Sequence, residues 1–235
     1  MNPDVVVAPL PMLLERLIED VREESARANA RRGLFAMALT GGSVGVFGFP
    51  ALATVPFDWN VTHLFWGDER AVPTTSEDSN FGLARKLWLT PAGVTAAAIH
   101  RMPADNPDLN AAAHHYRDEI LRVLGASPRF DHVLLGVGPD GHVASLFPGH
   151  PALSEERELV LPIVDSPKPP PRRLTLTMPM LTGAERVVVM ALGNMKAAAM
   201  KEALTRDDSS LPVALVLRRS RRPLVLLDRD ASSHV

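Results

Sequence analysis

Short apolar runs alternate with amphipathic segments along most of this chain, and this alternation constrains the fold more than any other feature. The segments at residues 10–32 and 107–124 carry apolar residues at helical spacing. Near-continuous apolar runs are typical of strands that are covered on both faces, as in a parallel sheet. The sequence therefore predicts an α/β fold, with a mostly parallel, doubly wound, Rossmann-like sheet and helices on both faces. The expected strands are residues 5–7, 34–39, 61–66, 132–137, 159–164, 174–178, 186–192 and 224–227.

Residue types at the segment ends predict where the helices begin and end. Gly33 and Gly125 follow helical patterns and predict helix ends. Asn106-Pro107 predicts a helix start, because Asn caps helices and Pro suits the first helical position. Asn194 is expected to cap a further helix that runs to about residue 204. No linker separates two cores, so we expect residues 1–235 to form a single domain.

The composition excludes several classes of protein. The 46% apolar and 22% charged residues are typical of a globular chain, and the absence of cysteine excludes disulfide scaffolds, thiolate nucleophiles and cysteine-ligated metals. A net charge of −2 gives no indication of nucleic-acid binding. No apolar stretch approaches the roughly 18 residues of a membrane span, and the N-terminus lacks the basic start of a signal peptide. We expect a cytoplasmic protein without membrane contact, either a monomer or a dimer.

Four unusual loops are expected at the carboxyl ends of strands, where open α/β sheets bind ligands. Gly41-Gly42-Ser43 is the first of them. Its backbone N–H groups and the following helix N-terminus suit an anion, although an ordinary glycine-rich turn has the same composition. The string from Gly41 to Gly45 also matches G-x-S-x-G, which would make Ser43 a nucleophile. Gly48 and Pro50 leave little room for the long helix that such a nucleophile needs.

The loop at residues 136–142 contains Asp140-Gly141-His142. A histidine is the natural general base at neutral pH, and an aspartate two residues away can orient its ring. The glycines of this loop also match G-x-G-x-x-G, but the mid-chain position and Pro139 argue against a nicotinamide cofactor. A purely structural histidine is the alternative.

The other two loops add charge to the same edge. Asp68-Glu69-Arg70 suits a polar wall that holds sugar hydroxyls, and alternation along an extended chain predicts that only one of the two acids faces the site. Lys196 falls in the first turn of a helix, where a cation is disfavoured unless a bound anion offsets the cost. A solvated charged turn and an exposed lysine are the alternatives.

The remaining candidate side chains give weaker indications of a functional role. His114-His115 is expected on a solvated helix face, and no metal-ligand spacing is present. His150 is near enough in sequence to line the pocket of His142, and Phe47 and Trp66 are expected in the core.

Several strings together resemble the glucosamine-6-phosphate isomerase/6-phosphogluconolactonase superfamily, in the family's order and over nearly the whole chain. They are residues 39–43, 65–70, 79–82, 131–148, 168–175 and 193–197. The resemblance implies hydrolysis of 6-phospho-D-glucono-1,5-lactone to 6-phospho-D-gluconate in the oxidative pentose phosphate pathway, with this phosphosugar lactone as the small-molecule partner and without metal or organic cofactor. It implies that His142 activates water with Asp140 beside it. It also implies substrate contacts at Gly41, Gly42, Ser43, Asp68, Arg70, Arg173 and Lys196.

Two local strings favour the lactonase branch of this superfamily. The deaminating isomerases continue the histidine loop with Phe-Asn-Glu-Pro and carry a tyrosine where Arg70 stands, whereas residues 145–148 here read Ser-Leu-Phe-Pro. Val44 replaces a threonine that is usual in the family, and we expect altered phosphate affinity rather than lost function. A sugar-phosphate sensor of this fold would need an added helix-turn-helix, for which the 33 residues before Leu34 are too few.

Overall fold

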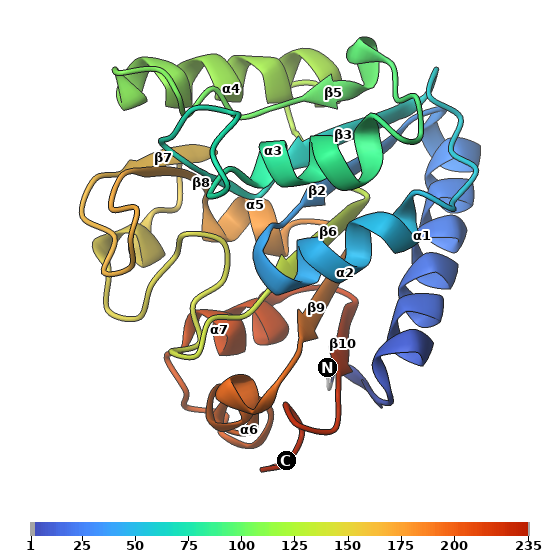
Figure 1. The fold of residues 1–235 in the computed structure, drawn as a ribbon. Helices are drawn as coiled ribbons and strands as arrows, with labels where there is room; N and C mark the ends of the chain where they lie inside the picture. The colour runs from blue at the N-terminus through green and yellow to red at the C-terminus, as the bar shows by residue number, and fades with distance from the viewer. Residues whose placement is uncertain (1–2, 235) are drawn as a thin grey trace.

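The computed structural model describes residues 3–234, and its centre is a seven-stranded sheet in the order β1-β10-β9-β6-β2-β3-β5 (Figure 1). Every neighbouring pair in this sheet is parallel. The predicted α/β class with a mostly parallel sheet is therefore confirmed. The strands are β1 (Asp4–Val7), β2 (Phe35–Leu39), β3 (Thr62–Trp66), β5 (Ile99–His100), β6 (His132–Gly136), β9 (Arg186–Ala191) and β10 (Pro223–Leu227).

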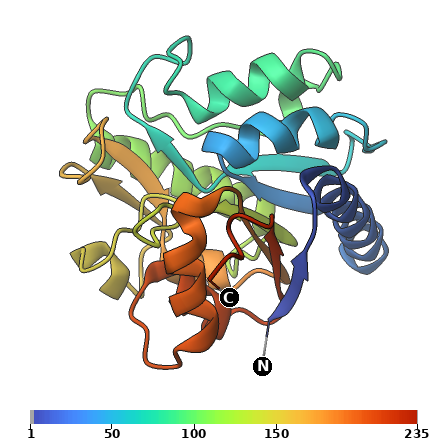
Figure 2. The same cartoon turned by 60° about the horizontal axis from the view of Figure 1, so that its bottom comes forward.

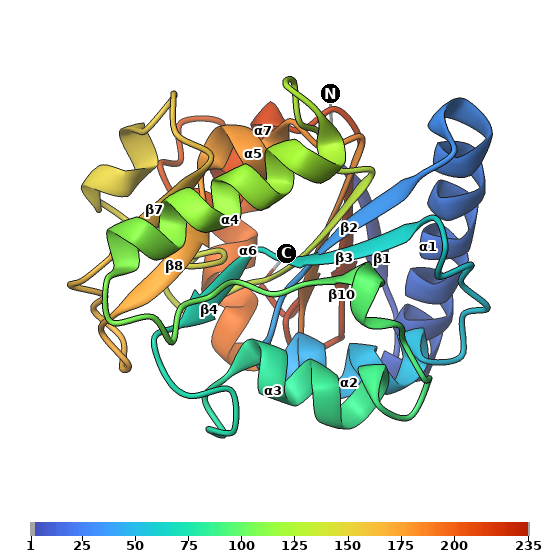
Figure 3. The ribbon, with the colours of Figure 1, turned by 90° about the horizontal axis from the view of Figure 1, so that it is seen from above.

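Helices cover both faces of this sheet, with α2 and α3 on one side and α4 and α5 on the other (Figure 3). The first strand pairs with the last, so the two chain ends lie near the same part of the molecule (Figure 2). None of the helices within residues 3–234 is long and apolar enough to cross a membrane. The helices are α1 (Leu10–Arg32), α2 (Gly42–Leu52), α3 (Asn80–Ala84), α4 (Leu109–Leu124), α5 (Met178–Thr182), α6 (Ala197–Thr205) and α7 (Pro212–Arg219).

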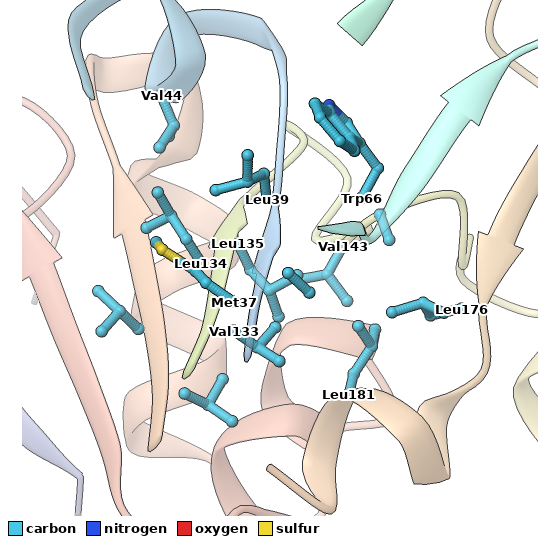
Figure 4. Close-up of a cluster of buried hydrophobic side chains, with 14 of the residues drawn as sticks. Met37, Leu39, Val44, Trp66, Val133, Leu134, Leu135, Val143, Leu176 and Leu181 are labelled. Atoms are coloured by element: carbon cyan, nitrogen blue, oxygen red, sulfur yellow. The ribbon is translucent and has the colours of Figure 1, made fainter. Parts of the chain in front are cut away.

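The core explains why the strand sequences are apolar without alternation. All five side chains of β2 are buried, and both of its neighbours in the sheet contribute buried side chains as well. Figure 4 shows Leu39 and Leu134 of the sheet between Val44 of α2 and Leu181 of α5. Because a helix covers each face, successive side chains that point to opposite sides are all removed from water.

A second, smaller sheet lies beside the carboxyl ends of the first, and its order is β4-β8-β7 with antiparallel pairs. It consists of β4 (Asp68–Arg70), β7 (Val160–Ile163) and β8 (Arg173–Leu176). The expectation that residues 67–70 form only a loop is wrong, because Asp68 pairs with Thr175 and Arg70 with Arg173. These partners lie about a hundred residues away in sequence, so local patterns do not reveal the pairing.

Two predicted helix starts differ from the structure. The N-cap of α4 is Asp108, whose Oδ1 accepts hydrogen bonds from the amides of Asn110 and Ala111 at 2.9 and 3.1 Å. The side chain of Asn106 instead accepts a bond from the Asp108 amide at 2.9 Å. A 3-10 turn at Asn194–Lys196 precedes α6, so Lys196 and not Asn194 occupies the N-cap position of that helix.

The glycines and the proline of α2 do not shorten it as expected. The helix continues through Gly48 and Pro50 to Leu52. Its outer face carries Phe47, which is 43% exposed, so the expectation that Phe47 lies in the core is wrong. Trp66 is fully buried, as predicted.

Candidate active site

One cavity of about 170 Å³ opens at the carboxyl ends of the central strands, and residues of all four unusual loops line it. Eight of the nine candidate site residues lie on its wall, and the ninth, Asp140, contacts His142. The wall includes Gly41, Gly42, Ser43, Asp68, Arg70, His142, Arg173 and Lys196. Residues that are far apart in sequence converge here because parallel strands end at the same edge of a sheet.

The loop after β6 is shaped around the His142 ring. The Gly138 amide donates to the His142 carbonyl at 2.8 Å, and the Gly141 amide donates to the Gly138 carbonyl at 2.9 Å. Gly141 has a φ of +80°, a conformation that suits glycine. A Cβ atom on Gly138 would lie 1.9 Å from the His142 Nδ1 atom. Glycine at position 138 therefore leaves free the space that the His142 ring occupies.

Asp140 orients this ring by a direct hydrogen bond. Its Oδ1 atom lies 2.5 Å from Nδ1 of His142. Because an ionised carboxylate only accepts, this bond assigns the ring proton to Nδ1 and leaves a lone pair on Nε2. The ring also packs against Phe147, with the ring centroids 4.7 Å apart.

The partly buried position of His142 keeps its ring suited to accept a proton. Burial lowers the pKa of His142 below its ordinary value, although the carboxylates of Asp140 and Asp68 act in the opposite direction. The nearby Lys168 ammonium lowers this pKa further. The imidazole is therefore largely neutral at pH 7, which is the form that a general base requires.

Asp68 is the acid of β4 that faces the cavity. Its carboxylate accepts hydrogen bonds from Ser145 Oγ at 2.7 Å and from Asn80 Nδ2 at 3.2 Å. The Glu69 side chain turns away and accepts bonds from Ser79 Oγ and from the Phe81 amide at 3.0 and 2.7 Å. The alternation predicted along this segment is present, and only Asp68 lines the cavity.

The two arginines on the wall differ in how many donors they have free. Arg173 donates from Nε to the Pro170 carbonyl at 2.9 Å, and from Nη2 to the carbonyls of Lys168 and Pro169 at 3.1 and 3.0 Å. Its Nη1 lies 3.4 Å from Ser145 Oγ. Four of the five N–H groups of a guanidinium are thus occupied by the chain itself.

Arg70 is less fully bonded. Its Nη1 donates to the Asp78 carbonyl at 2.7 Å. Its Nε is buried and has no hydrogen-bond partner among residues 3–234. Because Arg70 makes one side-chain hydrogen bond within residues 3–234 and Arg173 makes four, Arg70 has more donors left for a polar group in the cavity.

The opposite end of the cavity is suited to an anion. The first turn of α2 carries no acidic residue and no side-chain cap, so its backbone N–H groups are not occupied by a side chain of their own helix. Gly41 must be glycine, because a Cβ there would lie 1.8 Å from Asn80 Oδ1. Lys196 lies on the same wall, and within residues 3–234 no carboxylate is close enough to form an ion pair with it. Burial lowers the pKa of Lys196, and a bound anion would offset that effect.

Several wall residues were not predicted from the sequence as site residues. Thr40, Asn80 and Ala144 line the cavity, and Ala144 has an unusual φ of +49°. Lys168 was quoted only as part of a family string, yet its Nζ lies 3.6 Å from Asp140 Oδ2. Its position depends on the fold of a distant loop, which no local signal reveals.

His150 does not reach the cavity, so the expectation that it lines the pocket is wrong. Its Nε2 lies 3.0 Å from Asp165 Oδ1, and its Nδ1 accepts from the Ala152 amide at 3.1 Å. His114 and His115 are exposed on α4, as predicted. Across residues 3–234, no three His, Cys, Asp or Glu side chains are grouped so that they could hold a metal ion.

The serine-nucleophile arrangement is incomplete in this geometry. Ser43 and His142 line the same cavity, and His142 has its aspartate. No hydrogen bond joins Ser43 to His142 within the part of the chain that the structure describes. The pair therefore lacks the contact through which a histidine activates a serine.

Comparisons with known proteins agree with the resemblance seen in the sequence. Residues 10–225 match the family described as glucosamine-6-phosphate isomerases/6-phosphogluconolactonase. A 6-phosphogluconolactonase of Mycobacterium tuberculosis is 39% identical over 217 residues, which cover 88% of this chain and 87% of the relative. One of Rattus norvegicus is 40% identical over 211 residues and covers 86% and 80% respectively.

The fold matches solved structures equally well. The crystal structure of 6-phosphogluconolactonase from Thermotoga maritima superposes with a TM-score of 0.84 at 27% identity. The match covers 97% of this chain and 99% of that one.

Proposed function

Because the chain belongs to the glucosamine-6-phosphate isomerase/6-phosphogluconolactonase family, we propose that it hydrolyses 6-phospho-D-glucono-1,5-lactone to 6-phospho-D-gluconate. The observation that carries this proposal is a single cavity with an oriented Asp140–His142 pair and an anion-binding end at Gly41–Ser43 and Lys196. The enzyme is a lactone hydrolase, acts in the oxidative pentose phosphate pathway and works in the cytoplasm without a cofactor.

The phosphate binds where the cavity offers donors and positive charge. Backbone N–H groups at Gly42 and Ser43 and the Ser43 hydroxyl donate to its oxygens, and Lys196 balances its charge. This anchor is remote from the bond that breaks, so it serves to place the lactone carbonyl near His142. Val44 is buried and contributes packing where relatives carry a threonine hydroxyl.

The chemistry is a transfer of the acyl group to water. Nε2 of His142 removes a proton from a water molecule as the water oxygen bonds to the lactone carbonyl carbon. The tetrahedral intermediate collapses, the bond from this carbon to the ring oxygen breaks, and the His142 imidazolium returns the proton to that oxygen. Asp140 stabilises the imidazolium that exists between the two proton transfers.

The sugar hydroxyls bind at the polar wall. Asp68 has its carboxylate fixed by Ser145 and Asn80, so it accepts hydrogen bonds with little loss of side-chain freedom. Arg70 lines the cavity and bonds to the described chain through Nη1, so its Nη2 group can donate to the substrate. Arg173 contributes one remaining N–H and holds the adjoining loop.

The experiment that tests this proposal compares three substrates with the purified protein. Acid release from freshly made 6-phosphogluconolactone should exceed the spontaneous rate, glucono-1,5-lactone without phosphate should be a poor substrate, and glucosamine 6-phosphate should not be deaminated. Hydrolysis no faster than the spontaneous rate would refute the proposed function. Efficient deamination would instead favour the isomerase branch.

A further inference from the structure

Lys168 joins the Asp140–His142 pair as a third member. Asp140 uses its two carboxylate oxygens differently, because Oδ1 contacts His142 Nδ1 at 2.5 Å and Oδ2 lies 3.6 Å from Lys168 Nζ. The three side chains therefore form a row of cation, anion and imidazole that ends in the cavity. The mechanism above uses only the last two.

The backbone of Lys168 is held in place by buried groups. Ser166 Oγ donates to the Lys168 carbonyl at 2.8 Å and accepts from the Lys168 amide at 3.2 Å. Arg173, which is 3% exposed, donates to the same carbonyl at 3.1 Å. The lysine thus extends from a loop whose position is set by a residue of the cavity wall, and its ammonium is not free to leave Asp140 by a shift of the chain.

We propose that Lys168 is a positioning residue, which widens the pH range over which His142 stays in its neutral, proton-accepting form by sharing the charge of Asp140. The inference deepens the proposed function and rests on it. An Asp140 carboxylate that faced His142 alone would stabilise the imidazolium fully and leave a smaller fraction of the histidine neutral at a given pH. With Lys168 on the other oxygen, Asp140 still orients the ring but favours the cation less.

The remaining charges near His142 do not replace this contribution. Asp68 raises the pKa of His142, as Asp140 does, and Lys168 lowers it. Lys196 and Arg173 are the other cations near it on the cavity wall, together with Arg70. In the proposed complex the substrate phosphate offsets the charge of Lys196, and the Asp68 carboxylate, 4.0 Å from Arg173 Nη1, offsets that of Arg173. Within residues 3–234, Lys168 is the one lysine or arginine whose charge lies within 4.0 Å of Asp140.

The test is an NMR titration of the His142 ring, which needs no turnover. We expect Lys168→Met to raise the pKa of His142 by roughly half a unit, the scale of a partly solvent-screened charge. Lys168→Arg should restore the wild-type value, and His142→Gln identifies the resonance. Lys201→Met removes the same charge from an exposed position of α6 and should leave the titration unchanged.

The acidic limb of the kcat/KM profile should move to higher pH in Lys168→Met by the same amount. Should this variant fail to fold, Lys168→Gln serves the same purpose with a polar side chain. An unaltered His142 titration, or a raised KM at every pH without a shift of the limb, would overturn the inference. Since the titration is read without substrate, a wild-type protein that lacks lactonase activity would refute the proposed function separately.

Discussion

Gly138 lies directly beneath the ring of His142, so closely that a methyl group on its Cα would occupy the position of Nδ1, at 1.9 Å. The hydrogen bond from His142 Nδ1 to Asp140 passes through this same space, because a Cβ there would also lie 2.6 Å from Asp140 Oδ1. The glycine is thus a requirement of the Asp140–His142 pair and not merely of the turn.

Gly138→Ala should lower kcat by at least about 10²-fold, because the displaced ring loses both its orientation and its reach to the water. Gly48→Ala is the matched control, since its Cβ would meet only Leu17 Cδ2 at an ordinary 3.7 Å. Steady-state kinetics on both variants, with circular dichroism to verify folding, checks this prediction. A folded Gly138→Ala enzyme with normal kcat would show that the ring position does not matter.

Asp140→Asn should change both the height and the position of the pH profile. The plateau of kcat should fall by about 10²–10⁴-fold, because an amide no longer fixes the tautomer or stabilises the imidazolium. The Asp140 carboxylate raises the pKa of His142, so its removal lowers that pKa further. A base with a lower pKa remains neutral to lower pH, and the acidic limb of kcat/KM should shift downward.

This shift is opposite in sign to the one expected for Lys168→Met. Measuring both profiles in the same buffers therefore separates loss of the carboxylate from loss of its lysine partner. An acidic limb that moves upward in Asp140→Asn would contradict the assigned electrostatics.

Ser43→Ala and Lys196→Ala distinguish a phosphate site from a serine nucleophile. If both residues bind phosphate, each variant loses a charge-assisted hydrogen bond of about 1.5–3 kcal/mol, which appears mostly as a higher KM. Inorganic phosphate should compete weakly with substrate. A collapse of kcat in Ser43→Ala but not in Lys196→Ala, together with labelling of Ser43 by organophosphates in the wild-type protein, would instead establish Ser43 as the nucleophile.

A histidine pair away from the active site should make the fold sensitive to acid. His63 Nδ1 lies 2.8 Å from His100 Nε2, and burial lowers the pKa of both rings below 6.5. The folded state thus favours the neutral rings, so their stabilising contribution is present above about pH 6.5 and is lost as the pH falls through the lower folded values.

Between pH 7.5 and 5.5 the wild-type Tm should fall further than that of His63→Gln, because glutamine does not take up a proton in this range. His114→Gln removes an exposed histidine and should behave as the wild type does. Equal Tm losses in all three proteins would exclude a role for the pair. Differential scanning calorimetry provides the comparison.

The parts of the fold that the sequence predicts are those that local patterns determine. The helix from Leu10 to Arg32 ends at Gly33, which adopts a φ of +67°, as its residue type indicates. The strands of the large sheet are continuous apolar runs because both of their faces are covered, and such runs can be recognised in the sequence alone. The three-residue strand β4 has no such pattern, and it exists only because β8 lies beside it.

The same distinction applies to the site. Gly41, Asp68 and His142 belong to the segments that follow the carboxyl ends of β2, β3 and β6, so the rule for the edge of a parallel sheet predicts that they meet. Lys168 lies between β7 and β8 and Asn80 is the first residue of α3, and their contacts at the site depend on tertiary packing. The local sequence around these two residues carries no information about those contacts.

The direct test of His142 as the general base is the kcat of His142→Gln on 6-phosphogluconolactone, after the spontaneous rate of hydrolysis is subtracted. Glutamine keeps the size and polarity of the side chain but cannot take the proton of water. We expect a folded protein whose kcat is at least about 10²-fold below that of the wild type, the usual scale for a general base, with KM little changed because the phosphate anchor is intact. A folded His142→Gln enzyme with near-normal kcat would contradict the role of His142 as the base.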